Sequence, residues 1–323
     1  MGTLPETQNL ERYIQHAVVN VPKMDDALNF YTRGLGMRVI RTRTNPAKTN
    51  NVTFVGYGPE TLDLKRVENG FRPGISSYNE YGAHFTLELI EKRVPPELKS
   101  DDEDAQPVVQ AYEPGNGVQF LQIALPFLRV SQLAETGGNI RRAYGWIEVD
   151  APGGLPLRII IGERRDPFMF ACFTVKDLSA AKSFYETRLG MRELPYQKAR
   201  YNPDSPLEPK QPQESAYMGY SEDTFGLLLV QQDKKIAKKT PIEVGSVFDK
   251  LAILSRNVVE EGPSLNAGFT GPVPGIGTNV AAFKDAQGYG LVLVEYDDFE
   301  KELSDRGYLY LPPSFSTPAD DLV

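Results

Sequence analysis

The sequence predicts an α+β fold in which a β-α-β-β-β unit occurs four times. The first observation is an internal repeat, because ALNFYTRGLGMR at residues 27–38 returns as AKSFYETRLGMR at residues 181–192, an offset of 154 residues. The second is that each copy follows one strand-like run and precedes others. The third is that each half of the chain also contains a weaker second unit, so the repetition is fourfold.

The first unit can be followed element by element. Residues 17–21 form a β-like run, and a helix begins near Asp25. Gly36 ends this helix because glycine readily adopts the left-handed backbone of a helix stop. Residues 37–41 then resume as a strand. Residues 84–89 alternate between apolar and polar side chains, which predicts a strand with one buried face.

The other three units repeat this order. The third unit opens with a strand at residues 171–175 and a helix from Ser179. The strands that open and close the second and fourth units are residues 120–124 and 157–161, and residues 248–252 and 291–294. The units therefore predict a first module at residues 1–165 and a second at residues 166–300, followed by a helix end and an extended tail at residues 301–323.

Composition excludes several classes of protein. The net charge of −8 and the pI near 5.1 argue against nucleic-acid binding, which needs a basic surface to neutralise phosphates. No run of 18 apolar residues occurs, so no membrane span is expected. The single cysteine, Cys172, fits a reducing compartment, so we expect the cytoplasm or an organelle stroma or matrix. No presequence is visible at the start of the chain.

Two motifs identify a family resemblance. The pattern F-Y-x-x-x-L-G-M stands at residues 30–37 and again at residues 184–191, and residues 56–60 and 85–89 match the strands around it. The chain resembles the glyoxalase I branch of the vicinal-oxygen-chelate superfamily. Its likeness is greatest to two-module, glyoxalase-domain-containing relatives of lactoylglutathione lyase.

The resemblance implies that pairs of βαβββ units form two cup-shaped mixed sheets, each with a metal site at its base. Both swapped pairing (first unit with fourth, second with third) and sequential pairing remain open. Four units complete two cups within one chain, so a monomer is sufficient.

The resemblance implies that, in active relatives, one unit supplies a His or Gln from its first strand and a Glu from its last, and its partner unit supplies a His and a Glu from the equivalent strands. His16 and Glu88 match these positions in the first unit. The remaining positions have lost their ligands, and they are Phe120 and Arg158 in the second unit, Phe170 and Leu229 in the third, and Phe248 and Val292 in the fourth. No cup therefore collects more than two ligands, and Arg158 would repel a cation. A divalent metal (Zn, Ni, Co or Mn) is expected at most at the incomplete site of His16 and Glu88.

Three functions follow from this reading. The first is a glyoxalase I-like protein with degenerate metal sites, which binds a small molecule or a protein partner in its aromatic cups. The second is a metal-dependent lactoylglutathione lyase that isomerises the methylglyoxal–glutathione hemithioacetal, with Glu88 as its catalytic base. The third is a structural subunit of a larger assembly, suggested by an acidic loop at residues 99–105 and a proline-rich segment at residues 202–213. A glutathione adduct in the cup would meet Arg41, Arg43 and Lys92.

Overall fold

The computed structural model describes residues 12–44, 50–58, 60, 84–92, 111–196, 210–222, 224–237 and 239–305. Four βαβββ units follow one another in the order that the sequence predicts. The first unit comprises β1 (Tyr13–Asn20), α1 (Met24–Leu28), the π-helix η1 (Asn29–Gly34), β2 (Arg38–Thr44), β3 (Asn50–Gly56) and β4 (Thr86–Lys92). The second comprises β5 (Val118–Leu125), α3 (Val130–Glu135), β6 (Asn139–Tyr144), β7 (Trp146–Asp150) and β8 (Pro156–Ile161).

The third and fourth units have the same order. The third comprises β9 (Phe168–Val175), α4 (Leu178–Leu189), β10 (Arg192–Glu193), β11 (Ser215–Gly219) and β12 (Gly226–Gln231), and the short helix α5 (Lys234–Ala237) follows it. The fourth comprises β13 (Phe248–Ser255), α6 (Val258–Glu261), the 3₁₀-helix η3 (Gly262–Leu265), β14 (Phe269–Pro272), β15 (Asn279–Lys284) and β16 (Gly290–Glu295). Helix α7 (Tyr296–Asp305) closes the described chain.

The repeated helices end where the sequence predicts. Gly36 has φ 72° after η1, and Gly190 has φ 68° after α4. A side chain with a Cβ is strained in this left-handed region, so glycine is the natural stop. The helices begin one residue before the predicted starts. The Asp177 side chain caps α4 by accepting a hydrogen bond from the Ala180 backbone N–H.

The units pair in the swapped arrangement. One eight-stranded sheet, the first sheet, has the order β14-β15-β16-β13-β1-β4-β3-β2, and the second sheet has the order β10-β11-β12-β9-β5-β8-β7-β6. The first unit therefore joins the fourth through the antiparallel pair β1–β13, and the second joins the third through β5–β9. Each sheet takes one unit from residues 1–165 and one from residues 166–300. Neither sheet is therefore built from one sequence module alone, and the two modules stay a prediction about which parts of the chain are related in sequence.

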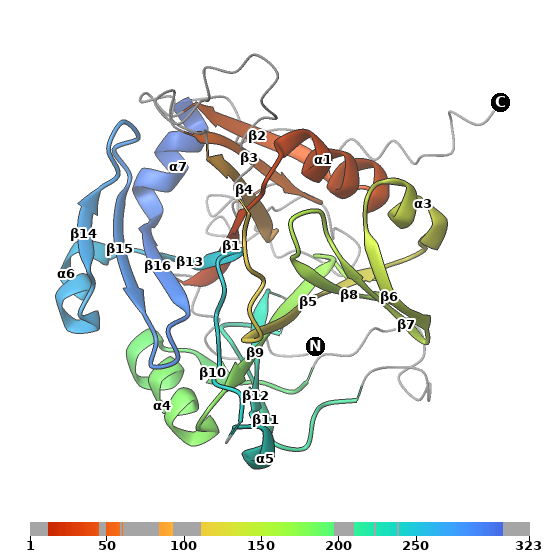
Figure 1. Ribbon diagram of the computed structural model, residues 1–323. Helices are drawn as coiled ribbons and strands as arrows, with labels where there is room; N and C mark the ends of the chain where they lie inside the picture. The colour runs from red at the N-terminus through yellow and green to blue at the C-terminus, as the bar shows by residue number, and fades with distance from the viewer. Residues whose placement is uncertain are drawn as a thin grey trace, which may run out of the picture.

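Each sheet has one face toward a common core and one that carries the predicted site residues, which we call its site face. The common core includes Ile14 and Leu87 from the first sheet and Leu121 and Leu227 from the second. Figure 1 shows α1 beside α3, and α7 alongside the strands of the first sheet. No helix in the described part of the chain is long and apolar enough to cross a membrane. The acidic loop, the tail from residue 306 and most of the proline-rich segment lie outside the described residues.

The repeat also creates a matched pair of buried tyrosines. Tyr185 on α4 donates a hydrogen bond to the carboxylate of Asp285 in the β15–β16 turn, at 2.9 Å. Tyr31 is the equivalent residue in the first unit, and Ala151 stands at the position of the β7–β8 turn that is equivalent to Asp285. The Tyr31 hydroxyl is buried and has no hydrogen-bond partner among the described residues.

We expect the two Tyr→Phe variants to differ in stability. Tyr185→Phe removes a buried hydrogen bond to a carboxylate and is expected to lower the free energy of unfolding by about 1.5–3 kcal/mol. Tyr31→Phe removes an unpaired hydroxyl, so we expect it to be neutral or stabilising. Urea unfolding of both variants tests this. Equal losses of stability would show that Asp285 contributes nothing through Tyr185.

Candidate functional site

The parallel pairing of β1 and β4 brings His16 and Glu88 together. His16 lies opposite Thr86, and Val18 lies opposite Glu88, so both site residues project from the same face two positions apart. Their side chains are buried, and His16 Nε2 lies 3.1 Å from Glu88 Oε2. The fold thus places the predicted half-site in one cluster on the first sheet.

A β-bulge at the same place in every opening strand identifies the positions equivalent to His16. The register shifts just before His16 in β1 and just before Phe120 in β5. The same shift precedes Phe170 in β9 and Lys250 in β13. The register therefore places Lys250, rather than Phe248, at the His16 position of the fourth unit. Phe248 points to the common core instead, because the extra residue of a bulge changes which side chains face each side.

The closing strands give the positions equivalent to Glu88. Arg158 pairs with Gln122, two residues after Phe120, and Val292 pairs with Ala252, two residues after Lys250. In the third unit, Leu228 pairs with Cys172, so Leu228 holds this position and Leu229 faces the common core. The assignments of Phe248 and Leu229 made from the sequence are corrected to Lys250 and Leu228. Leu229 lies one residue past Leu228, and such a slip turns a side chain to the opposite face of the sheet. Phe248 lies two residues before Lys250, across the bulge at Asp249.

Glu88 is bound by the protein's own cations. Its Oε1 lies 3.1 Å from Arg43 Nη1, and its Oε2 faces His16. Burial by itself would raise the pKa of Glu88, but the charges of Arg43 and His16 outweigh burial and hold the pKa at about 2. The carboxylate is therefore ionised and already neutralised by neighbouring side chains.

Two further glutamates complete this network. Arg41 Nε lies 2.6 Å from Glu60 Oε2, and Arg41 Nη1 lies 3.0 Å from Glu302 Oε1. Arg43 Nη2 also lies 3.0 Å from Glu302 Oε1. We call these residues (Arg41, Arg43, Glu60, Glu88 and Glu302) the carboxylate–arginine cluster. The Arg41 side chain is fully buried and stacks 3.4 Å from the centre of the Phe54 ring, so it is directed at the protein rather than at a ligand.

Helix α7 brings the last member of the cluster to the site face. Phe299 and Leu303 pack against Ala252 and Val292 of the first sheet. Glu302 on the same helix then reaches both arginines, and its second oxygen accepts a hydrogen bond from the Thr278 hydroxyl at 3.1 Å. The site face of the first sheet is therefore partly filled by the protein's own C-terminal helix.

These residues do not fit a divalent metal. A catalytic zinc site needs three protein ligands with free lone pairs and an open position. Here the described residues contain no group of three or more His, Cys, Asp or Glu side chains that could hold an ion. His16 Nδ1 contacts Gln15 Oε1 and Nε2 contacts Glu88, so both ring nitrogens already have protein partners. The Arg43 guanidinium beside Glu88 would also repel a cation.

The second sheet has a different site face. Arg158 stacks on Phe120, with its guanidinium carbon 3.6 Å from the ring centre, and its Nη2 lies 2.9 Å from Glu148 Oε1. Trp146 donates its indole N–H to the same oxygen at 2.9 Å. Partial burial by itself would raise the pKa of Glu148. The contacts with Trp146 and Arg158 outweigh burial and lower this pKa. The Phe170 ring lies 6.2 Å from Phe120 and extends the aromatic surface.

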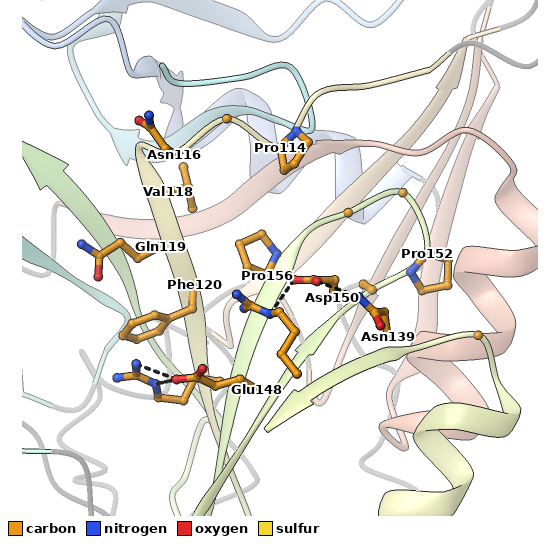
Figure 2. A pocket seen from close by; sticks show the side chains of 17 residues that line it. Pro114, Asn116, Val118, Gln119, Phe120, Asn139, Glu148, Asp150, Pro152 and Pro156 are labelled. Carbon is orange, nitrogen blue, oxygen red and sulfur yellow. Dashed lines mark hydrogen bonds and ion pairs between the residues drawn. The ribbon is translucent and has the colours of Figure 1, made fainter. Parts of the chain in front are cut away.

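A pocket of about 760 Å³ opens over this face. Figure 2 shows Phe120 and Glu148 at the lower left of the view, Pro114 at the top and Pro152 at the right, with Pro156 between them. Arg158 and Arg141 also line it. A volume of this size suits a small organic ligand.

His84 and Lys92 lie apart from the carboxylate–arginine cluster, and Cys172 lies in the apolar cluster that contains Phe120 and Phe170. His84 precedes β4, and its Nε2 lies 3.1 Å from the Arg165 carbonyl oxygen, so it does not join His16. Burial raises the pKa of the Cys172 thiol to about 12, which makes it unreactive. Lys92 is exposed at the end of β4, and its role in substrate binding stays a prediction.

Sequence reasoning missed Glu60, Glu148, Lys250 and Glu302. Glu60 stands in a segment that the family motif includes, and the face of β7 that carries Glu148 follows from strand alternation. Glu302 lies 259 residues from its partner Arg43, and no local pattern signals that contact.

Comparison with known proteins gives a consistent result. The sequence model of the Glyoxalase/Bleomycin resistance protein/Dioxygenase superfamily matches residues 13–120. A lactoylglutathione lyase of Arabidopsis thaliana is 28% identical over 317 residues, covering 90% of this chain and 94% of that protein. A probable chloroplastic lactoylglutathione lyase of the same plant is 26% identical, covering 92% of this chain and 76% of that protein. The crystal structure of glyoxalase I from Zea mays shares the fold, with a TM-score of 0.67, 24% identity, and coverage of 90% of this chain and 95% of that one.

Proposed function

Since this chain is a glyoxalase I-like, two-module member of the vicinal-oxygen-chelate superfamily, we propose that it binds a small molecule without a metal and does not catalyse hemithioacetal isomerisation. The observation that carries the proposal is the ion pair between Glu88 and Arg43. The Arg43 guanidinium neutralises the Glu88 carboxylate, which would otherwise neutralise a catalytic metal ion.

Substitutions at the equivalent positions support the proposal. In the first sheet, the positions of the fourth unit that are equivalent to His16 and Glu88 hold Lys250 and Val292, and neither an ammonium group nor an alkyl group binds a cation. In the second sheet, the four positions hold Phe120, Arg158, Phe170 and Leu228. Aromatic and apolar side chains of this kind suit an organic ligand.

Metal content and lyase activity test the proposal together. We expect purified protein to retain no stoichiometric Zn, Ni, Co or Mn by elemental analysis. We also expect hemithioacetal isomerisation at the uncatalysed rate, unchanged by a chelator or by added metal, because too few donors are available to hold the ion.

The two histidines of the chain provide a matched pair of variants. His16→Ala removes the half-site, whereas His84→Ala removes the histidine that lies outside it. One equivalent of bound metal, together with chelator-sensitive turnover that His16→Ala abolishes and His84→Ala retains, would establish a lactoylglutathione lyase instead.

A further inference from the structure

Arg158 has an unused hydrogen-bonding edge in the pocket of the second sheet. Its Nε and Nη2 both contact a single oxygen, Glu148 Oε1, at 3.2 and 2.9 Å. Its Nη1 has no partner among the described residues. The Arg158 side chain is only 20% exposed, and the Phe120 ring covers one face of the guanidinium. A partly desolvated guanidinium with a free N–H edge is a strong site for a carboxylate oxygen.

A second guanidinium lines the same pocket. Arg141 on β6 uses its Nε to contact Asp150 Oδ1 at 3.1 Å, and the described residues leave its two terminal nitrogens free. Asp150 is engaged further by Asn139, whose amide donates to Oδ2 at 3.2 Å. The two arginines thus keep N–H donors without a partner among the described residues, which favours an anionic ligand.

The charge balance limits how highly charged this ligand is. The arginines that line the pocket, Arg141 and Arg158, are matched by Glu148 and Asp150. A polyanion would meet these two carboxylates and be repelled, whereas one carboxylate group needs only the edge of Arg158.

The remaining lining mixes apolar residues with Asn116, Gln119 and Asn139. Pro114, Pro152, Pro156 and the Phe120 ring form the walls around the arginines. Proline and phenylalanine side chains offer apolar surface to the body of a ligand.

We propose that the pocket of the second sheet binds a small organic monocarboxylate with an apolar body, whose carboxylate meets the free edge of Arg158. This inference rests on the proposed metal-free binding function and names its ligand class. The ligand carboxylate contacts Nη1 of the guanidinium, the nitrogen that Glu148 does not contact.

The single tryptophan of the chain reports on this site. Trp146 shares Glu148 Oε1 with Arg158, and the Arg158 guanidinium carbon lies 5.5 Å from the indole ring centre. Tryptophan emission during titration with phenylacetate, without added metal, therefore measures binding. We expect a saturable change with phenylacetate and at least tenfold weaker binding of the neutral isostere phenylacetamide, a difference of about 1.4 kcal/mol.

Variants measure separately what each of the two arginines contributes to binding. Arg158→Met is expected to weaken phenylacetate binding at least tenfold. Arg141→Gln, at a more exposed position that is safer for folding, is expected to weaken it about threefold. Arg33→Gln makes the same charge change on the exposed side of η1 and is expected to leave binding unchanged.

Each alternative result has a distinct meaning. Equal binding of phenylacetamide and phenylacetate overturns the carboxylate inference and leaves metal-free binding in place. Absence of saturation by phenylacetate up to about 10 mM also overturns the inference. A response that requires added Zn and is lost with a chelator overturns the proposed function itself. Glutathione is titrated in parallel. Tighter binding of glutathione than of phenylacetate also overturns the inference.

Discussion

The Glu302→Gln variant is expected to be about 3–5 kcal/mol less stable to unfolding than the wild-type protein. Glu302 neutralises both Arg41 and Arg43, and its side chain is almost fully buried. Glutamine keeps the shape of the side chain but removes its charge. The variant therefore leaves two guanidiniums at the first sheet with fewer counter-charges, and breaking one partner of a buried ion pair costs more than the pair contributes.

The exposed Glu260 on α6 provides the control, because Glu260→Gln makes the same change in solvent. We expect this control to stay within about 0.5 kcal/mol of wild type. Guanidinium chloride unfolding of the three proteins measures the difference. If Glu302→Gln costs no more than Glu260→Gln, the cluster does not hold α7 against the first sheet.

Glu88 is expected to contribute about 3 kcal/mol of stability that is lost on acidification, since a shift from 4.5 to about 2 corresponds to that energy. Burial disfavours the ionised carboxylate, but Arg43 and His16 outweigh burial and depress the pKa. A depressed folded-state pKa makes the contribution complete above the unfolded value of 4.5. It is then lost as the pH falls from about 4.5 toward 2.

Other buried carboxylates act in the opposite direction. Burial raises the pKa of Asp166 and Asp285, so their protonation stabilises the folded state and their contribution is lost as the pH rises. The total pH dependence therefore mixes both signs, and only a comparison between proteins isolates Glu88.

Unfolding of wild type and Glu88→Gln across pH 2 to 7 makes this comparison. Glutamine cannot titrate, so the stability difference between the two proteins should shrink by about 3 kcal/mol as the pH falls through the window. A difference that stays constant with pH would show that Arg43 does not depress the pKa of Glu88.

The sequence is sufficient to predict the repeated architecture. Its evidence is local, because the motif ending at Gly36 and its copy ending at Gly190 each specify a buried helix face and a left-handed stop. The resemblance to the glyoxalase I family also identifies His16 and Glu88 as the ligand positions of the first unit, and the bulge register of the second and third units agrees with Phe120 and Phe170.

The register error at Phe248 has a physical cause, whereas Leu229 is a one-residue miscount in β12, which pairs with β9 without a bulge. A bulge adds one residue to a strand without a distinctive sequence, since Gln15, Gln119, Met169 and Asp249 occupy the four bulges. Two are glutamines, one is a methionine and one is an aspartate, so no single residue type marks the bulge. Sequence spacing alone therefore miscounts which side chains reach the site face.

The amino-acid sequence by itself determined that four βαβββ units occur and that only one of them keeps both a histidine and a glutamate at the ligand positions. The tertiary structure alone decided that the first unit joins the fourth, and that Glu302 meets Arg41 and Arg43 across about 260 residues. The physical reason is range. Periodicity and helix stops depend on neighbouring residues, whereas ion pairs between distant segments form only once the sheets and α7 are packed together.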